Sequence, residues 1–129
     1  MKALVFHGSK DVRIDNVEDP VIEHSEDIIL KVTSTAICGS DLHIYNGMFP
    51  QPRPMTLGHE FMGIIQDVGK GVTKLKKGDR VVVPFPVACG HCHFCIHQLL
   101  GACEESDPEN YGPEGGLVKG KGGGMFGYT

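Results

Sequence analysis

The sequence predicts a mainly β fold, a small β-barrel or sandwich of short strands joined by many turns. Eighteen glycines and eight prolines occur among the 129 residues, against six Phe, three Tyr and no Trp. This composition favours turns and short strands over long helices. The second observation is a series of short apolar, β-branched stretches at a spacing typical of small barrels and sandwiches. The length is sufficient for one domain with a single core.

Three strands are predicted in the first third of the chain. Residues 2–7 form the first strand, and residues 12–15 alternate well enough to be its hairpin partner across a turn at residues 8–11. Residues 27–36 (Asp-Ile-Ile-Leu-Lys-Val-Thr-Ser-Thr-Ala) form the clearest strand, because β-branched side chains suit a pleated, half-buried surface.

The remainder of the chain alternates loops with short elements. We expect a helical turn at 40–46, an extended loop containing Pro50, Pro52 and Pro54, strands at 61–68 and 80–83, and a short helix within 92–100. Proline lacks a backbone donor, so the loop cannot join a sheet interior. From residue 101 onward the sequence has almost no periodicity.

Composition and charge exclude several classes of function. The formal net charge is −4 and no basic block occurs, which argues against nucleic acid or an acidic membrane surface as the main partner. The first apolar run is too short for a signal-peptide core, and no later run approaches a membrane span. A cytoplasmic location is therefore expected, where five cysteines are more typical of metal ligands or catalytic groups than of disulfides.

Four of the cysteines are closely spaced: Cys89, Cys92, Cys95 and Cys103. Four thiolates can close a tetrahedral site, and zinc held only by thiolates is structural. The alternatives are weaker. An iron–sulfur run would favour a Pro after the last cysteine and a more distant fourth ligand. Haem attachment at the Cys-x-x-Cys-His stretch would leave two cysteines unexplained. The sequence predicts a structural zinc lobe over residues 89–103, whose metal supplies much of the local folding energy.

The fifth cysteine belongs to a second group of candidate ligands. Cys38 follows the clearest strand, and His59 and Glu60 precede the next one, with Asp41 and His43 close by. A strand-end Cys and a strand-start His can converge on one metal, and catalytic zinc typically has three protein ligands and one open position. A lone Cys is nevertheless more often a small core residue. The residues alone leave both interpretations open.

Three motifs together resemble the zinc-dependent, medium-chain alcohol dehydrogenase family. Residues 58–63 (Gly-His-Glu-Phe-Met-Gly) with the glycine at position 69 look like its signature, residues 38–43 (Cys-Gly-Ser-Asp-Leu-His) resemble its catalytic-zinc segment, and the four-cysteine lobe resembles its structural-zinc segment. The motifs occur in the family's order, and the match covers residues 1–105. The resemblance implies a GroES-like small β-barrel with short helices and a zinc-binding lobe, with residues 1–129 forming an incomplete catalytic domain.

The resemblance also implies roles for individual residues. Cys38 and His59 would be catalytic-zinc ligands, Glu60 a transient or outer ligand, Asp41 the carboxylate that orients His59, and Ser40 and His43 the relay that carries the alcohol proton to solvent. The four lobe cysteines would hold the structural zinc. The intact enzyme would transfer hydride between a zinc-bound small alcohol or aldehyde and NAD or NADP, and would be a homo-oligomer.

No dinucleotide-binding fingerprint accompanies these motifs. The glycine clusters at residues 115–116 and 120–124 neither follow a clear strand nor open a helix, so they predict loop. We therefore expect the Rossmann domain and the family's usual third catalytic-zinc ligand to be absent from this chain. The chain alone is then expected to bind structural zinc, to hold catalytic zinc weakly, and to lack dehydrogenase turnover.

Two further expectations concern the kind of protein. The glycine-rich ending at residues 123–128 looks most like the formaldehyde-dehydrogenase-like branch of the family. The alternative function is a stand-alone zinc-binding, non-catalytic interaction module. A co-chaperonin-like module is disfavoured, because it has no use for a Gly-His-Glu motif or four clustered cysteines.

Overall fold

The computed structural model describes residues 1–48 and 54–106. Its elements are β1 (Lys2–Gly8), β2 (Asp11–Asn16), β3 (Ile28–Thr35), α1 (Gly39–Tyr45), β4 (Met55–Thr56), β5 (Phe61–Val68), β6 (Arg80–Val83), α2 (His93–Ile96) and the 3-10 turns η1 (Leu100–Ala102) and η2 (Glu104–Ser106). The predicted mainly β fold is confirmed. Pro50, Pro52 and the glycine-rich ending lie outside the described residues. No helix in the described part of the chain is long and apolar enough to cross a membrane.

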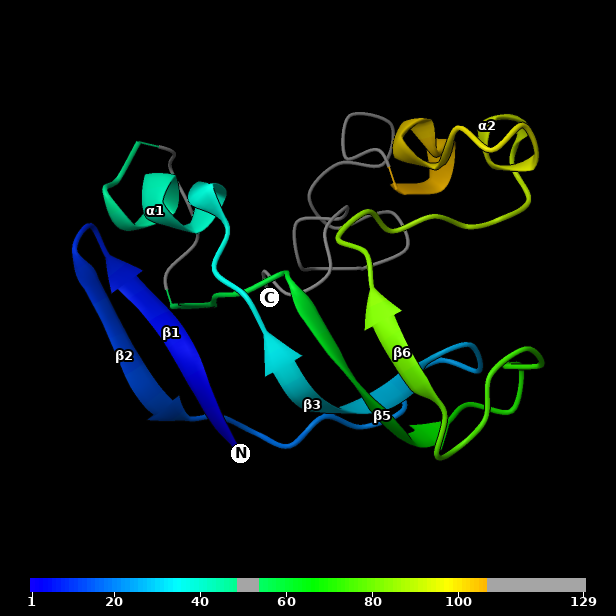
Figure 1. The fold of residues 1–129 in the computed structure, drawn as a ribbon, viewed down its shortest axis with the longest axis horizontal. Helices are drawn as coiled ribbons and strands as arrows, with labels where there is room; N and C mark the ends of the chain where they lie inside the picture. Colours follow the sequence, from blue (N-terminus) through cyan, green and yellow to red (C-terminus); the bar gives the residue numbers. More distant parts are fainter. Residues whose placement is uncertain (49–53, 107–129) are drawn as a thin grey trace.

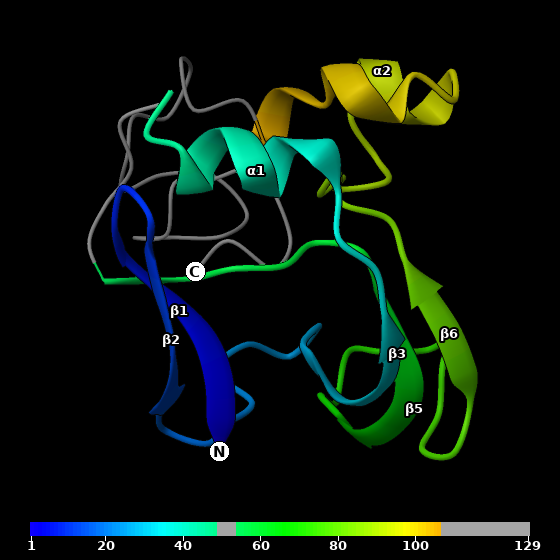
Figure 2. The same cartoon turned by 60° about the vertical axis from the view of Figure 1, so that its left-hand side comes forward.

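The strands form two three-stranded antiparallel sheets, with the orders β2-β1-β4 and β3-β5-β6. Figure 1 shows the two sheets next to each other, with α1 above the first and the cysteine lobe, which contains α2, above the second. The view in Figure 2 shows the same arrangement from another side. The short strand β4, which pairs Met55–Thr56 with β1, was not predicted, because two residues are too few to show a periodicity.

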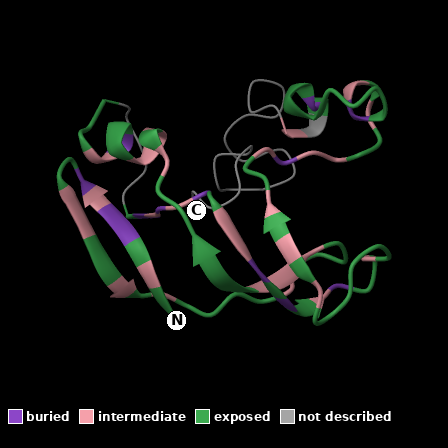
Figure 3. Cartoon of the chain, in the orientation of Figure 1, coloured by how far each residue is buried: buried purple, intermediate pink, exposed green. Residues whose placement is uncertain are grey.

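The described core lies mainly between the first sheet and α1. Phe6 is 1 % exposed and packs with Ile44 of α1, Met55 and Leu57. The second sheet contributes Ile65, which is fully buried. Figure 3 shows these buried segments in purple on β1, α1 and β5. The core thus fixes α1 against β1, and with it the chain segment that leaves β3.

Pairing of β3 with β5 brings the two candidate ligand segments together. Thr35, the last residue of β3, lies opposite Phe61, the first residue of β5. The hydroxyl of Thr35 and the backbone N–H of Ala36 both donate to the carbonyl oxygen of Glu60, at 2.9 and 2.8 Å. Residues just after β3 and just before β5 therefore lie at the same end of the sheet.

Candidate metal centres

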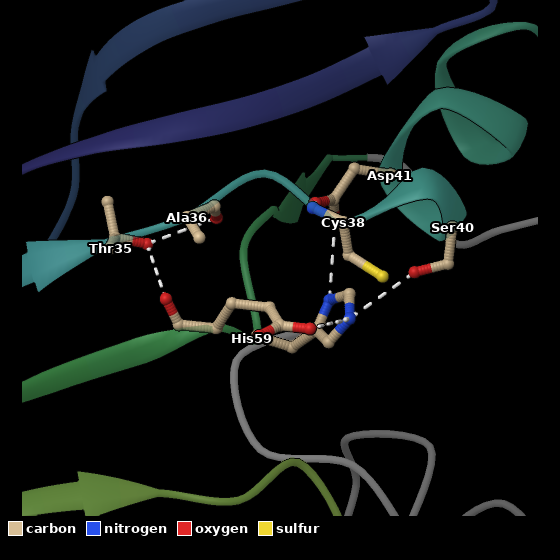
Figure 4. A network of polar contacts seen from close by, with 7 residues as sticks. Thr35, Ala36, Cys38, Ser40, Asp41 and His59 are labelled. Atoms are coloured by element: carbon tan, nitrogen blue, oxygen red, sulfur yellow. Dashed lines mark hydrogen bonds and ion pairs between the residues drawn. The ribbon is translucent and has the colours of Figure 1, made fainter.

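Cys38, His59 and Glu60 meet at that end of the sheet. One ligand atom from each lies within 4.8 Å of the corresponding atoms of the other two. His59 is only 4 % exposed, whereas Cys38 is half-buried and Glu60 is exposed. Figure 4 shows the Cys38 thiol pointing toward the His59 ring. The structure thus brings together the thiol, the imidazole and the carboxylate that were predicted as candidate ligands, with the carboxylate on the solvent side.

Asp41 links the two sides of this cluster. The backbone N–H of Cys38 donates to Asp41 Oδ2 at 2.8 Å, while Asp41 Oδ1 lies 3.4 Å from His59 Nδ1 (Figure 4). The Asp41 side chain is 13 % exposed, so water screens this contact only weakly. A carboxylate facing one ring nitrogen favours the tautomer with the proton on that nitrogen, leaving the lone pair on the other. The lone pair of His59 is therefore expected on Nε2, the nitrogen that faces Ser40 and Glu60.

The surroundings of His59 Nε2 contain three further groups. Ser40 Oγ lies 3.3 Å from Nε2, and Glu60 Oε1 lies 3.9 Å from it. The ring of Phe85, just after β6, meets the imidazole edge to face, with 5.9 Å between ring centres. Phe85 was not predicted as a site residue. Its one signal in the sequence is an aromatic residue two positions after a predicted strand. His43 is exposed on α1, three residues beyond Ser40, and its Nδ1 lies 3.1 Å from Met48 Sδ.

The donor set of this cluster fits zinc. Thiolate, imidazole and carboxylate are the ligands that zinc takes in proteins, at about 2.0–2.3 Å from the ion. Tetrahedral angles then place the ligand atoms about 3.5 Å apart, within the 4.8 Å over which the three atoms gather. Three protein ligands beside an exposed face leave room for one more ligand. Such an open donor set is typical of catalytic rather than structural zinc.

The four lobe cysteines form the second centre. Their sulfur atoms all lie within 4.8 Å of one another, and Cys89 Sγ is 3.9 Å from Cys95 Sγ. Zinc–sulfur bonds of about 2.3 Å at tetrahedral angles require sulfur atoms about 3.8 Å apart. All five cysteines of the chain are free thiols. The lobe therefore has the donor number and spacing of a closed four-thiolate site.

Backbone donors already favour negative charge in the lobe. The N–H of Cys89 donates to Cys103 Sγ at 3.3 Å, and the N–H of Cys92 donates to Cys89 Sγ at 3.3 Å. Burial opposes ionisation of Cys103. Hydrogen bonds from the N–H of Cys89, from the side chain of Ser106 and from the neighbouring Cys89 and Cys95 thiols outweigh it and lower the pKa of this thiol to about 6.

Cys95 shows the opposite behaviour, because burial raises the pKa of its thiol to about 12. Backbone donors can thus stabilise part of the charge, but not four thiolates at once. A cation at the centre of the cluster would offset this cost, since thiols that coordinate a metal are deprotonated. The donor chemistry of the lobe therefore fits a bound cation.

The glycines of the Gly-His-Glu motif each have a structural reason. Gly58 adopts a φ of +109°, which side-chain-bearing residues rarely adopt. A Cβ at Gly63 would lie 2.3 Å from the carbonyl oxygen of Lys31, and one at Gly69 would lie 2.3 Å from that of Ser25. The motif therefore specifies both the turn before His59 and the close approach of β3 and β5.

Comparison with known families agrees with this geometry. The family described as the alcohol dehydrogenase GroES-like domain matches residues 24–128. The zinc-type alcohol dehydrogenase-like protein AdhB of Bacillus subtilis is 56 % identical over 108 residues, which are 83 % of this chain and 29 % of the relative. Formaldehyde dismutase of Pseudomonas putida is 42 % identical over 99 % of this chain and 34 % of its own length.

Solved structures show the same relationship. Alcohol dehydrogenase TADH from Thermus sp. ATN1 superimposes with a TM-score of 0.78 at 40 % identity, over 93 % of this chain and 35 % of that one. Galactitol-1-phosphate dehydrogenase from Escherichia coli gives a TM-score of 0.75 at 31 % identity. The chain spans about a third of the length of these relatives.

Proposed function

This chain belongs to the zinc-type alcohol dehydrogenase family, as its GroES-like domain, and we propose that it performs the substrate-binding half of an alcohol or aldehyde oxidoreductase. The observation that carries the proposal is the convergence of Cys38, His59 and Glu60 at the ends of β3 and β5, with Asp41 behind the imidazole. A structural site would have no need for an exposed position beside its ligands.

Zinc is the metal we assign to both centres. Cys89, Cys92, Cys95 and Cys103 would hold one ion in the lobe, residues 89–103, and Cys38, His59 and Glu60 would hold the other. Zinc in an open site lowers the pKa of a ligated alcohol, so that its proton leaves near neutral pH. Glu60 would supply the third protein ligand from within this chain, although the resemblance implied only an outer or transient role for it.

In the proposed reaction, side chains of this chain remove the alcohol proton and hold the His59 imidazole in place. The Ser40 hydroxyl, 3.3 Å from His59 Nε2, is positioned to accept the proton of an alcohol bound beside that nitrogen. His43 follows three residues later on the exposed side of α1 and would pass the proton to solvent. Asp41 fixes the imidazole, and the Phe85 ring lies against the imidazole on another side. Ser40 and His43 are thus the proposed proton relay.

A nicotinamide dinucleotide is the proposed hydride acceptor. Two solved relatives support it: a zinc-binding dehydrogenase from Sinorhizobium meliloti bound to NADP, and an alcohol dehydrogenase from Escherichia coli complexed with NADH. Formaldehyde dismutase and the glutathione-independent formaldehyde dehydrogenase of Pseudomonas aeruginosa are 42 % and 38 % identical to this chain. They support a small aldehyde or primary alcohol as substrate. A homo-oligomeric state of the whole enzyme remains a prediction.

A graft experiment tests this function. This chain replaces the matching segment of the Thermus sp. ATN1 alcohol dehydrogenase, and NADH and NADPH formation is followed with a series of primary alcohols. We expect turnover by the graft and its loss by at least about a hundredfold in the Cys38→Ser graft, which keeps the lobe zinc. A zinc-loaded, folded graft that oxidises no alcohol would instead favour a non-catalytic zinc-binding module.

A further inference from the structure

Two histidines at the outer side of the lobe take no part in either metal centre. His93 begins α2 and His97 follows its end, and both side chains are exposed. Figures 1 and 2 show α2 at the edge of the molecule, away from both sheets. The centres of the two imidazole rings lie 4.5 Å apart, with the ring planes tilted by 40°. Helical residues four apart are neighbours on one face, which explains this proximity.

A hydrogen bond prepares His97 for metal binding. Its Nδ1 lies 2.7 Å from the backbone carbonyl oxygen of His93. A carbonyl oxygen only accepts, so Nδ1 carries the proton and the lone pair of the ring is on Nε2. Histidines that bind metals typically have this arrangement, with the second nitrogen donating to a carbonyl or carboxylate. His97 thus offers Nε2 to a cation from a fixed tautomer.

The distance between the rings fits two imidazoles that bind one cation. With a metal–nitrogen bond of about 2.1 Å, a coordinated ring has its centre about 3.2 Å from the ion. Two such rings at a right angle have centres about 4.5 Å apart, whereas at the tetrahedral angle the separation is about 5.2 Å. The observed 4.5 Å lies within about 1 Å of both separations, so the two rings are close enough to share one ion. Imidazole pairs bind first-row divalent cations such as Ni²⁺, Cu²⁺ and Zn²⁺.

We propose that His93 and His97 form a third, exposed metal site that binds a first-row divalent cation through two imidazoles, with water in the remaining positions. Imidazole suits nickel, copper and zinc, and among divalent cations the affinity order places nickel and copper high. The site is chemically distinct from the lobe, because thiolate ligands favour softer metal ions than imidazole ligands do. Since His93 lies between Cys92 and Cys95 in the sequence, the ion would be held on the outer surface of the lobe.

Nickel binding to the zinc-loaded chain tests this proposal. Ni²⁺ is titrated by calorimetry into the wild type and into His93→Gln, His97→Gln and His24→Gln, and zinc is measured before and after. His24→Gln is the matched control, because His24 is also exposed but lies far along the chain from the lobe. We expect about one Ni²⁺ per wild-type chain, at least about tenfold weaker binding in His93→Gln and His97→Gln, and no change in His24→Gln.

A spectroscopic readout locates the ion independently of affinity. Paramagnetic Ni²⁺ should broaden the ring signals of His93 and His97 first in NMR spectra, with the zinc content unchanged. Three results would overturn the proposal: absence of Ni²⁺ binding, equal binding by His97→Gln and the wild type, or uptake of Ni²⁺ only with release of zinc. The last result would put the ion among the lobe thiolates.

Discussion

Substitution of Gly63 by alanine tests how the fold builds the site. A Cβ at this position would lie 2.3 Å from the carbonyl oxygen of Lys31, 2.8 Å from its carbonyl carbon and 2.9 Å from Leu30 Cγ. Ordinary contact needs about 1 Å more, so β3 and β5 must separate. Overpacking of this kind costs about 1–3 kcal/mol. Hydrogen bonds weakened beside it add about 1 kcal/mol.

The loss of backbone freedom in the unfolded chain partly offsets this cost, by about 0.4–1 kcal/mol. Gly63→Ala should therefore lower the free energy of unfolding by about 2–3 kcal/mol and Tm by about 10 °C. Urea and thermal unfolding of the zinc-saturated protein measure both. Gly101→Ala is the control, because a Cβ there meets nothing within 4 Å. Equal unfolding midpoints for the two variants would refute the close-approach explanation of the motif.

Three other changes have defined outcomes. Ile65→Ala removes a side chain that is 0 % exposed and should lower the free energy of unfolding, measured in urea, by about 2–5 kcal/mol. The control Ile14→Ala changes a residue that is 66 % exposed and should lower it by less than about 0.5 kcal/mol. Similar losses in the two variants would contradict the assigned core. Asp41→Asn removes the charge facing His59 Nδ1. The zinc affinity of the cluster of Cys38, His59 and Glu60 should then fall about 10–100-fold in competition titrations. An unchanged affinity would exclude Asp41 as a positioning residue. In the reduced, metal-free chain the urea midpoint should rise between about pH 6 and 9, because the pKa of Cys103 is lowered to about 6 from 9.0, and the folded state releases its proton first. It should fall between about pH 9 and 12, because the pKa of Cys95 is raised to about 12 and the unfolded state releases that proton first. Cys95→Ser should abolish the fall and keep the rise, and an unaltered profile would contradict this cause.

The predictable part of the fold depends on local pattern. The β-branched residues 27–36 and the alternation at residues 61–68 correspond to β3 and β5, because side-chain periodicity is a property of each strand alone. The pairing of β4 with β1 and the 2.3 Å approach at Gly63 depend on how separate strands meet. Such contacts leave no period in the sequence, so only the three-dimensional structure reveals them.

The candidate site also has a part that was predictable from the sequence and a part that only the structure reveals. The proximity of Cys38 and His59 was predictable, because Cys38 comes just after β3, His59 comes just before β5, and these two strand ends lie side by side. The orienting contact of Asp41 had been inferred from resemblance, and the structure gives it a distance and a second partner in the Cys38 N–H. The edge contact of Phe85 with His59 was beyond prediction, since it joins a residue before β5 to a residue after β6 with no shared motif.

The zinc content of three proteins tests the central claim most directly, which is that the chain has two separate metal centres of different kinds. The wild type, Cys103→Ser and Cys38→Ser are washed with a mild chelator and then analysed for metals. A closed four-thiolate site should keep about one zinc per chain in the wild type and in Cys38→Ser, and lose it in Cys103→Ser. Added zinc should then supply a second, weaker equivalent in the wild type but not in Cys38→Ser. Iron in the purified chain, or tightly held zinc that survives Cys103→Ser, would contradict the account.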